Sequence, residues 1–127
     1  MRNEKCSLVG IHYIECMIWH IPISKTSACL VILENDAMVL TGGASAVDPE
    51  ISTDVTDKVL QLENPNDGWS VMPEMNKPRF AHGCGVVKDG DKQRIVIAGG
   101  KGSDLAELNS VEVYEVGGLL FPPWIEG

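Results

Sequence analysis

Two stretches of the chain carry the same short motif, and they decide the fold. Met38-Val39-Leu40-Thr41-Gly42-Gly43 recurs 57 positions later as Ile95-Val96-Ile97-Ala98-Gly99-Gly100. A second pair precedes them, because Ala28-Cys29-Leu30-Val31-Ile32 recurs 55 positions later as Gly83-Cys84-Gly85-Val86-Val87. A repeat of this period indicates a protein built from successive copies of one supersecondary unit.

Each pair of apolar runs is joined by a polar turn, which predicts a β-hairpin. The turns are Glu34-Asn35-Asp36 in the first copy and Lys88-Asp89-Gly90-Asp91-Lys92-Gln93 in the second. Asn, Asp and Gly tolerate the positive φ angles of tight turns. The double glycine that follows each hairpin allows a positive φ, or a close approach of another chain segment where a Cβ would clash.

Two further strands complete each copy. Polar stretches at residues 44–57 and 101–109 lead to Val59-Leu60-Gln61-Leu62-Glu63 and to Val111-Glu112-Val113-Tyr114-Glu115. The second of these alternates apolar and polar residues, which is typical of a half-buried strand. A fourth strand is expected near Trp69 and its counterpart near Trp124.

The same reading divides the chain into three parts. Residues 1–26 form an N-terminal segment in which Trp19 marks the last strand of a preceding unit. The first whole unit covers residues 27–78. The second covers residues 79–127 and is either complete or cut short in its last strand.

This pattern resembles the Kelch repeat over residues 27–124. In that repeat a hydrophobic run closed by Gly-Gly is followed by a strand with an aromatic residue and then by a tryptophan that opens the last strand. The matching residues are Gly42, Gly43, Trp69, Gly99, Gly100, Tyr114 and Trp124. Leu62 departs from the pattern because tyrosine is usual there, and the interval from Tyr114 to Trp124 is longer than its counterpart. Residues 72–82 resemble the usual link between blades, with Arg79 inside it and Lys25 in the corresponding place upstream.

The resemblance implies an all-β fold, a partial β-propeller of four-stranded antiparallel Kelch-type blades. Propellers close with about four to eight blades, so two blades cannot form a ring. The remaining blades are expected from missing parts of a longer chain or from self-assembly of several copies. Two blades alone would expose strand edges and apolar faces.

The four cysteines predict reduced thiols, because they show no Cys-x-x-Cys spacing and are too sparse for a disulfide-built domain. Cys29 and Cys84 fall at equivalent places in the two copies, which favours a small buried core residue. His82 and Cys84 share one face of a strand, but two ligands fall short of the three or four that zinc requires. We therefore expect no metal and no cofactor.

Charge and composition favour a protein partner. The chain has 44% hydrophobic and 22% charged residues and a formal net charge of -8. That charge supplies no attraction to nucleic acid or to an anionic membrane. The apolar stretch at residues 8–23 is interrupted by His12, Glu15 and His20 and lacks a cleavage site for a signal peptide. Without an Asn-x-Ser/Thr acceptor, the chain is expected in the cytoplasm.

No catalytic set can be assembled from the spacing of the residues, so we expect a non-catalytic interaction module rather than an enzyme. The resemblance implies scaffolds and adaptors, among them substrate adaptors of ubiquitin ligases and actin-associated proteins. Two alternatives remain, namely a fragment of a copper-oxidase or sugar-modifying propeller, and a truncated product without function. Loops on a rigid scaffold often carry recognition, and the candidate contact residues are Asp48, Glu50, Asp54, Asp57 and Arg79.

Overall fold

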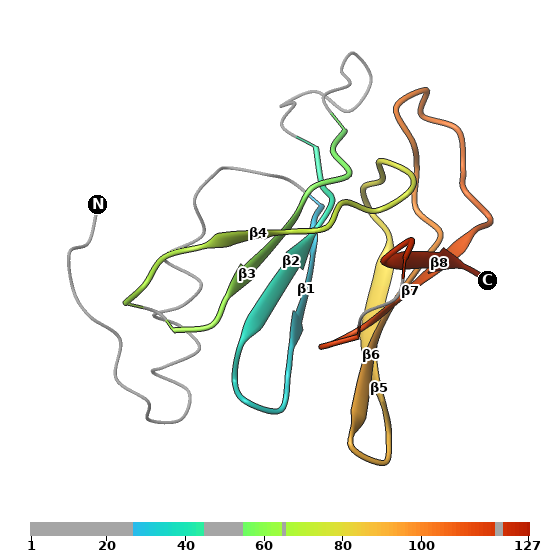
Figure 1. Ribbon diagram of the computed structural model, residues 1–127. Helices are drawn as coiled ribbons and strands as arrows, with labels where there is room; N and C mark the ends of the chain where they lie inside the picture. Colours follow the sequence, from blue (N-terminus) through green and yellow to red (C-terminus); the bar gives the residue numbers. More distant parts are fainter. Residues whose placement is uncertain (1–26, 45–54, 65, 119–120) are drawn as a thin grey trace.

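Our computed structural model describes residues 27–44, 55–64, 66–118 and 121–127. Within these ranges the protein is all-β, with two antiparallel four-stranded sheets and no helix (Figure 1). The expected all-β class is therefore confirmed. No helix capable of crossing a membrane occurs in the described ranges. The strand expected near Trp19 lies outside them.

Each sheet is a simple meander in which consecutive strands pair with each other. The first sheet contains β1 (Cys29–Ile32), β2 (Met38–Thr41), β3 (Val59–Leu62) and β4 (Ser70–Met72). The second contains β5 (Gly83–Asp89), β6 (Lys92–Ala98), β7 (Val111–Glu115) and β8 (Trp124–Glu126). The two expected hairpins and the fourth strands near Trp69 and Trp124 are confirmed.

The register of the hairpins corrects one sequence expectation. Cys84 lies opposite Ile97, whereas Cys29 lies opposite Thr41. Leu40 is the repeat counterpart of Ile97, and it pairs with Leu30. The structural counterpart of Cys84 is therefore Leu30, one residue beyond the position that the sequence match indicated.

That one-residue shift matters because successive side chains of a strand point to opposite faces. Cys29 and Cys84 consequently face in opposite directions relative to their own sheets, and both face the space between the sheets. The prediction that they are equivalent core positions is wrong. The turns explain the error, since β1 and β2 are joined through five residues, 33–37, and β5 and β6 through the two-residue turn at 90–91.

The main core lies between the two sheets. The first sheet contributes Val31, Val39 and Val59, and the second contributes Ile95 and Ile97. All of these are buried. The indole of Trp124 joins this core and stacks at 5.1 Å from the ring of Tyr114. Burial of this apolar surface is the main force that holds the sheets together.

The opposite face of each sheet is also apolar. In the first sheet, Met38 and Leu62 form a second cluster with Leu30 and Trp69. In the second sheet, one row across all four strands consists of Gly85, Val96, Val113 and Ile125. Ile125 is 45% exposed, and Val87 nearby on this face is 52% exposed. The outer face of the second sheet thus presents an apolar row beside the charged side chains of Arg94 and Glu115, and the two sheets do not close into a ring.

The glycine pairs behave as the sequence predicted, because Gly42, Gly43, Gly99 and Gly100 all have positive φ. Their surroundings differ, however. A Cβ on Gly42 would collide with the main-chain oxygen of Arg79 and would lie 2.7 Å from the His82 ring. A Cβ on Gly100 would lie 2.6 Å from the main-chain oxygen of Phe80. Both glycines therefore permit the close approach of the segment between the sheets.

Gly90 offers a matched control for this crowding. Its φ of 63° nearly equals the 62° of Gly42, but a Cβ at Gly90 would contact nothing within 4 Å. We expect Gly90→Ala to cost about 1–2 kcal/mol through backbone strain alone. Gly42→Ala should cost at least about 2 kcal/mol more, because it adds a steric collision. Urea unfolding of both variants measures the difference, and equal losses would contradict the close packing described here.

Candidate functional site

The segment between β4 and β5 crosses one end of the second sheet, from the edge strand β8 to the opposite edge strand β5. At the outer side, the Trp124 indole nitrogen donates to the Pro73 main-chain oxygen at 2.8 Å. The Asn76 side chain donates back to the Trp124 main-chain oxygen at 3.0 Å. Farther along, the main chains of Phe80 and Lys101 exchange two hydrogen bonds of 3.0 and 2.9 Å. The link is thus fixed to the sheet at several points.

Glu112 is the buried acid at the centre of this crossing. Its side chain is fully buried, and its Oε2 lies 2.8 Å from Nη2 of Arg79. Oε1 accepts a hydrogen bond of 2.6 Å from the main-chain nitrogen of Asn76, and Oε2 accepts one of 3.1 Å from that of Lys77. A buried carboxylate is tolerated only when its charge and its lone pairs are satisfied, as they are here.

Arg79 joins the two sheets. Its guanidinium donates to the main-chain oxygens of Gly99 and Ser110 at 3.0 and 3.1 Å, and to the Ser110 hydroxyl at 3.0 Å. Its own main-chain oxygen accepts a 2.9 Å hydrogen bond from Gly43 of the first sheet's double glycine. Since the side chain is fully buried, Arg79 stabilises the joint and does not present its charge to solvent.

Sequence reasoning did not identify Glu112, although a signal was present. The alternation in β7 is confirmed, but its polar residues Glu112 and Tyr114 face the first sheet, and Val111 and Val113 face outward. In the first sheet the position of Glu112 is held by Leu60, because both pair with the counterpart residues Leu40 and Ile97. A charge at a place that is apolar in the other copy, together with one arginine in the link, is the pattern that could have revealed the pair.

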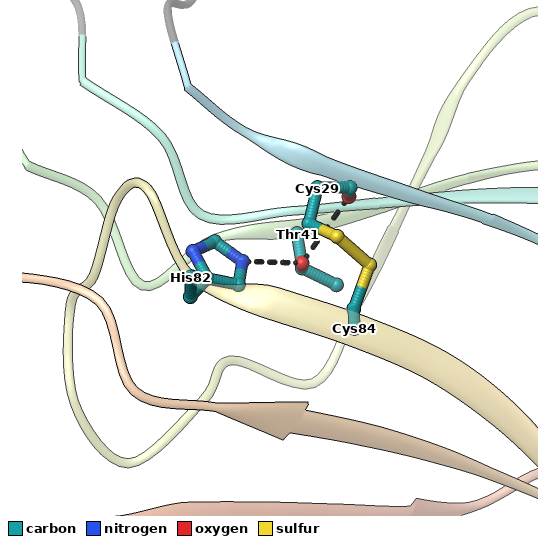
Figure 2. The surroundings of a disulfide bond; sticks show 4 residues. All are labelled: Cys29, Thr41, His82 and Cys84. Atoms are coloured by element: carbon teal, nitrogen blue, oxygen red, sulfur yellow. Dashed lines mark hydrogen bonds between the residues drawn. A yellow bond between two sulfur atoms is a disulfide. The ribbon is translucent and has the colours of Figure 1, made fainter. Parts of the chain in front are cut away.

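A second polar contact joins the sheets beside the cysteines (Figure 2). The Thr41 hydroxyl donates to the main-chain oxygen of Cys29 at 3.2 Å and lies 2.8 Å from Nε2 of His82. With the single hydroxyl hydrogen directed at Cys29, the tautomer consistent with both contacts has Nε2 of His82 as the donor of the second bond. Nδ1 is then an unprotonated acceptor, and it is buried without a hydrogen-bond partner.

His82 is therefore held neutral. Burial, followed by the nearby positive charge of Arg79, lowers the pKa of His82 from 6.5 to about 4. Its hydrogen bond to Thr41 opposes this shift but is the weaker influence. At neutral pH the imidazole is uncharged and packs between the two sheets, where it contacts Thr41.

Cys29 and Cys84 form a disulfide across the two sheets (Figure 2). Their Cα atoms are 6.1 Å apart, within the usual range for such a bridge. The expectation of reduced thiols is wrong for these two residues, because their opposite orientations bring the sulfur atoms together. Cys6 and Cys16 lie outside the described residues. With its sulfur in the bridge, Cys84 supplies no thiolate, and no group of three potential metal ligands occurs in the described ranges.

The candidate interaction surface is the end of the molecule where the link between β4 and β5 and the loop between β6 and β7 project together (Figure 1). A cleft of about 290 Å³ lies between them, and its lining residues are Ala81, Gly100, Lys101, Glu107 and Leu108. The connection between β2 and β3 also leaves and returns at this end of the molecule, where Ala44 pairs with Val55. The hairpin turns of β1–β2 and β5–β6 lie at the opposite end.

The structure separates the residues that the sequence suggested for partner contact. Asp48, Glu50 and Asp54 lie outside the described residues. Asp57 is half-buried beside the link, and its main-chain oxygen accepts a 2.9 Å hydrogen bond from Met75. Arg79 is internal, so the exposed charges that the structure adds to this end include those of Lys101, Asp104 and Glu107 in the β6–β7 loop.

Comparison with known proteins gives no relative, since no protein-family model matches the sequence and no curated protein matches it.

The buried ion pair yields a stability prediction. Glu112→Gln should cost about 3–5 kcal/mol, because it leaves the Arg79 charge buried without a counter-charge. The double variant Arg79→Met with Glu112→Leu should be more stable than the single variant, since it removes both charges. Chemical unfolding measures each free energy.

Glu126→Gln is the control, because its ion pair with Lys77 is nearly half exposed and should contribute less than about 1 kcal/mol. Equal losses for Glu112→Gln and Glu126→Gln would refute the central place of the buried pair.

The neutral state of His82 predicts an acid-sensitive fold. Its pKa is lower in the folded chain than in the unfolded chain, so the unfolded state binds more protons between pH 6.5 and about 4. The free energy of unfolding should therefore fall as the pH drops through this window, and this contribution should level off below it. We expect a fall of about 1–2 kcal/mol, less than the full shift would give, because solvent screens a group that is not completely buried.

Other groups also titrate there, so the measurement is the difference between the wild type and His82→Gln. The variant keeps a donor for Thr41 and should lose this part of the pH dependence. Parallel stability curves for the two proteins would show that His82 is not the titrating group.

Proposed function

We propose that this chain provides two blades of a Kelch-type β-propeller and serves as a non-catalytic scaffold that binds another protein through the loops at one end. The arrangement of the sheets supports this proposal. Each is a four-stranded antiparallel meander, and the chain passes from the last strand of the first sheet to the first strand of the second. Successive blades of a propeller are connected in the same manner.

The apolar row on the outer face of the second sheet also supports a larger assembly. Val96, Val113 and Ile125 form a continuous row on this face, and an exposed apolar row on a strand face favours a neighbour. In the proposed assembly, a further sheet covers this face. It comes from the rest of a longer protein or from an additional copy of the chain.

One observation carries the proposal of a binding scaffold, namely the rigid anchoring of loops at a single end. The link is fixed by Arg79 and Glu112, and its residue Phe80 pairs with Lys101, where the β6–β7 loop begins. Lys101 also pairs with Glu107 across that loop. Loops held on a rigid frame bind partners without a large loss of conformational entropy.

The charge of the chain favours a basic partner surface. Residues 42–58, which connect β2 to β3, contain four acidic residues, Asp48, Glu50, Asp54 and Asp57, and one basic residue, Lys58. Acidic loops attract a basic surface during encounter and disfavour an acidic one. The resemblance to Kelch proteins implies substrate adaptors and actin-associated scaffolds as the functional class.

Exchanging two charges at the loop end tests the proposal. In Lys101→Glu with Glu107→Lys the net charge of -8 is unchanged, but the local charge order is reversed. The matched control is Asp91→Lys with Lys92→Glu at the opposite end, where both residues are also exposed. Each chain is immobilised, and proteins captured from a cell extract are quantified by mass spectrometry.

We expect a specific partner to be captured by the wild type and by the control, and to be reduced about tenfold or more by the loop-end variant, as loss of a central contact would do. If every captured protein is retained equally by both variants, the loop end is not a binding surface.

A further inference from the structure

The disulfide between Cys29 and Cys84 joins β1 of the first sheet to β5 of the second, and we call this side of the interface its inner edge. It links residues 55 positions apart, and it is the one disulfide within the described residues. β1 and β5 lie next to each other across the interface (Figure 1). The bridge therefore crosses between the sheets and does not stabilise either one separately.

The outer strands are held by other means. β8 is bound to the link through Trp124, Pro73 and Asn76, and β7 is bound through Glu112 and Arg79. None of these contacts involves the cysteines. The outer part of the interface has its own set of hydrogen bonds and a buried ion pair, so it does not depend directly on the bridge.

Fewer contacts other than the disulfide hold β1 and β5 together. Besides the bridge, the polar contacts across this edge in the described residues include the Thr41–His82 hydrogen bond and a 2.8 Å bond from the Ala81 main chain to Ser27. Near the hairpin turns, the Glu34 main-chain nitrogen also donates to Oε1 of Gln93 at 2.9 Å, but this bond is exposed. At the far end, Glu34 pairs with Lys88 at 2.7 Å, but both side chains are more than half exposed. An exposed pair of this kind contributes little.

The sequence around Cys84 makes the contact between β1 and β5 depend more strongly on the disulfide. Gly83 and Gly85 flank it in β5, so Cys84 carries the only side chain over these three positions. Glycine also leaves the backbone free to move once a constraint is lost. Neither cysteine is required by the repeat, because the counterpart of Cys84 is Leu30 and that of Cys29 is Gly83.

We propose that the Cys29–Cys84 bridge is a reversible redox clamp on the inner edge of the two-sheet interface. Both cysteines are only partly buried as residues, and exchange of the bridge requires that a thiolate reach one of its sulfur atoms. A dithiol reductant attacks one sulfur, forms a mixed disulfide and then closes to its own disulfide. Two electrons and two protons pass to the protein, which gains two thiols.

Reduction removes the covalent tie between β1 and β5 and leaves this edge with the apolar contacts of Val31 and Val86 and the polar contacts named above. We expect this edge to open while the outer strands remain joined. The Thr41–His82 bond lies beside the bridge (Figure 2) and is the next contact to be lost. His82 packs against Gly100, the residue before Lys101 in the β6–β7 loop. The clamp thus changes the position of the loop end. This inference does not depend on the proposed partner binding.

NMR spectroscopy of the full chain tests the clamp. Cys6→Ser and Cys16→Ser are introduced so that only the pair under study can oxidise. Spectra are compared in the oxidised form and after addition of a small dithiol. We expect NOEs between β1 and β5 to disappear on reduction, and resonances of Thr41 and His82 to shift. NOEs between the Trp124 indole and Pro73 should persist.

A third cysteine variant separates loss of the bridge from any effect of the reductant. Cys84→Ser in the same background should give the spectrum of the reduced chain and should not respond to the dithiol. Three results would overturn the proposal: free thiols in the oxidised preparation, β1–β5 NOEs that survive reduction, or loss of all inter-sheet NOEs. The last would make the bridge a general stabiliser of the fold. None of these results depends on a binding partner.

Discussion

The ion pair between Arg79 and Glu112 is the interaction on which the relation of the two sheets depends. Two opposite charges are placed where water is excluded, a situation that is unfavourable unless the donors and acceptors around them are matched. Most are matched here, although Nε of Arg79 is buried without a hydrogen-bond partner. Glu112 meets two main-chain N–H groups of the link as well as the guanidinium. The carboxylate therefore shapes the link, and the link in turn brings Arg79 to the double glycine of the first sheet. Hydrophobic burial supplies the attraction between the sheets, and the ion pair sets their orientation.

The glycine pairs make room for the link that carries Arg79 of the ion pair. Gly42 and Gly100 leave the space in which the link passes, and a Cβ at either position would meet main-chain atoms of Arg79 or Phe80. The motif that repeats in the sequence thus marks where a neighbouring segment must come close. His82 closes the same region as a neutral side chain, because burial, and then the positive charge of Arg79, disfavour its protonated form. Packing and electrostatics consequently meet at this end of the molecule, and the loops that leave it are held in place.

Much of the fold could be predicted from the sequence, and the reasons are local. Apolar runs, turn residues and Gly-Gly pairs each fix short-range structure, so all eight strands were located. The site was less accessible, because its geometry depends on register. Turns of unequal length moved Cys29 one position relative to Cys84, which reversed its face and produced a bridge that the aligned repeats did not suggest. Glu112 was missed for a related reason, since alternation along β7 defines two faces but does not tell which of them is buried.

Leu60 and Glu112 occupy corresponding positions in the two sheets, and the difference between them fixes the order of the two units in the chain. On the side of the first sheet that bears Leu60, an apolar neighbour meets every requirement, whereas the corresponding side of the second sheet accepts only a segment that carries a suitably placed cation. The two units are therefore not interchangeable. A gene in which their order was swapped would retain the composition of the chain and both sets of strands, yet it would separate the acid from the arginine that precedes it. The difference at this one position therefore fixes which unit must come first in the chain.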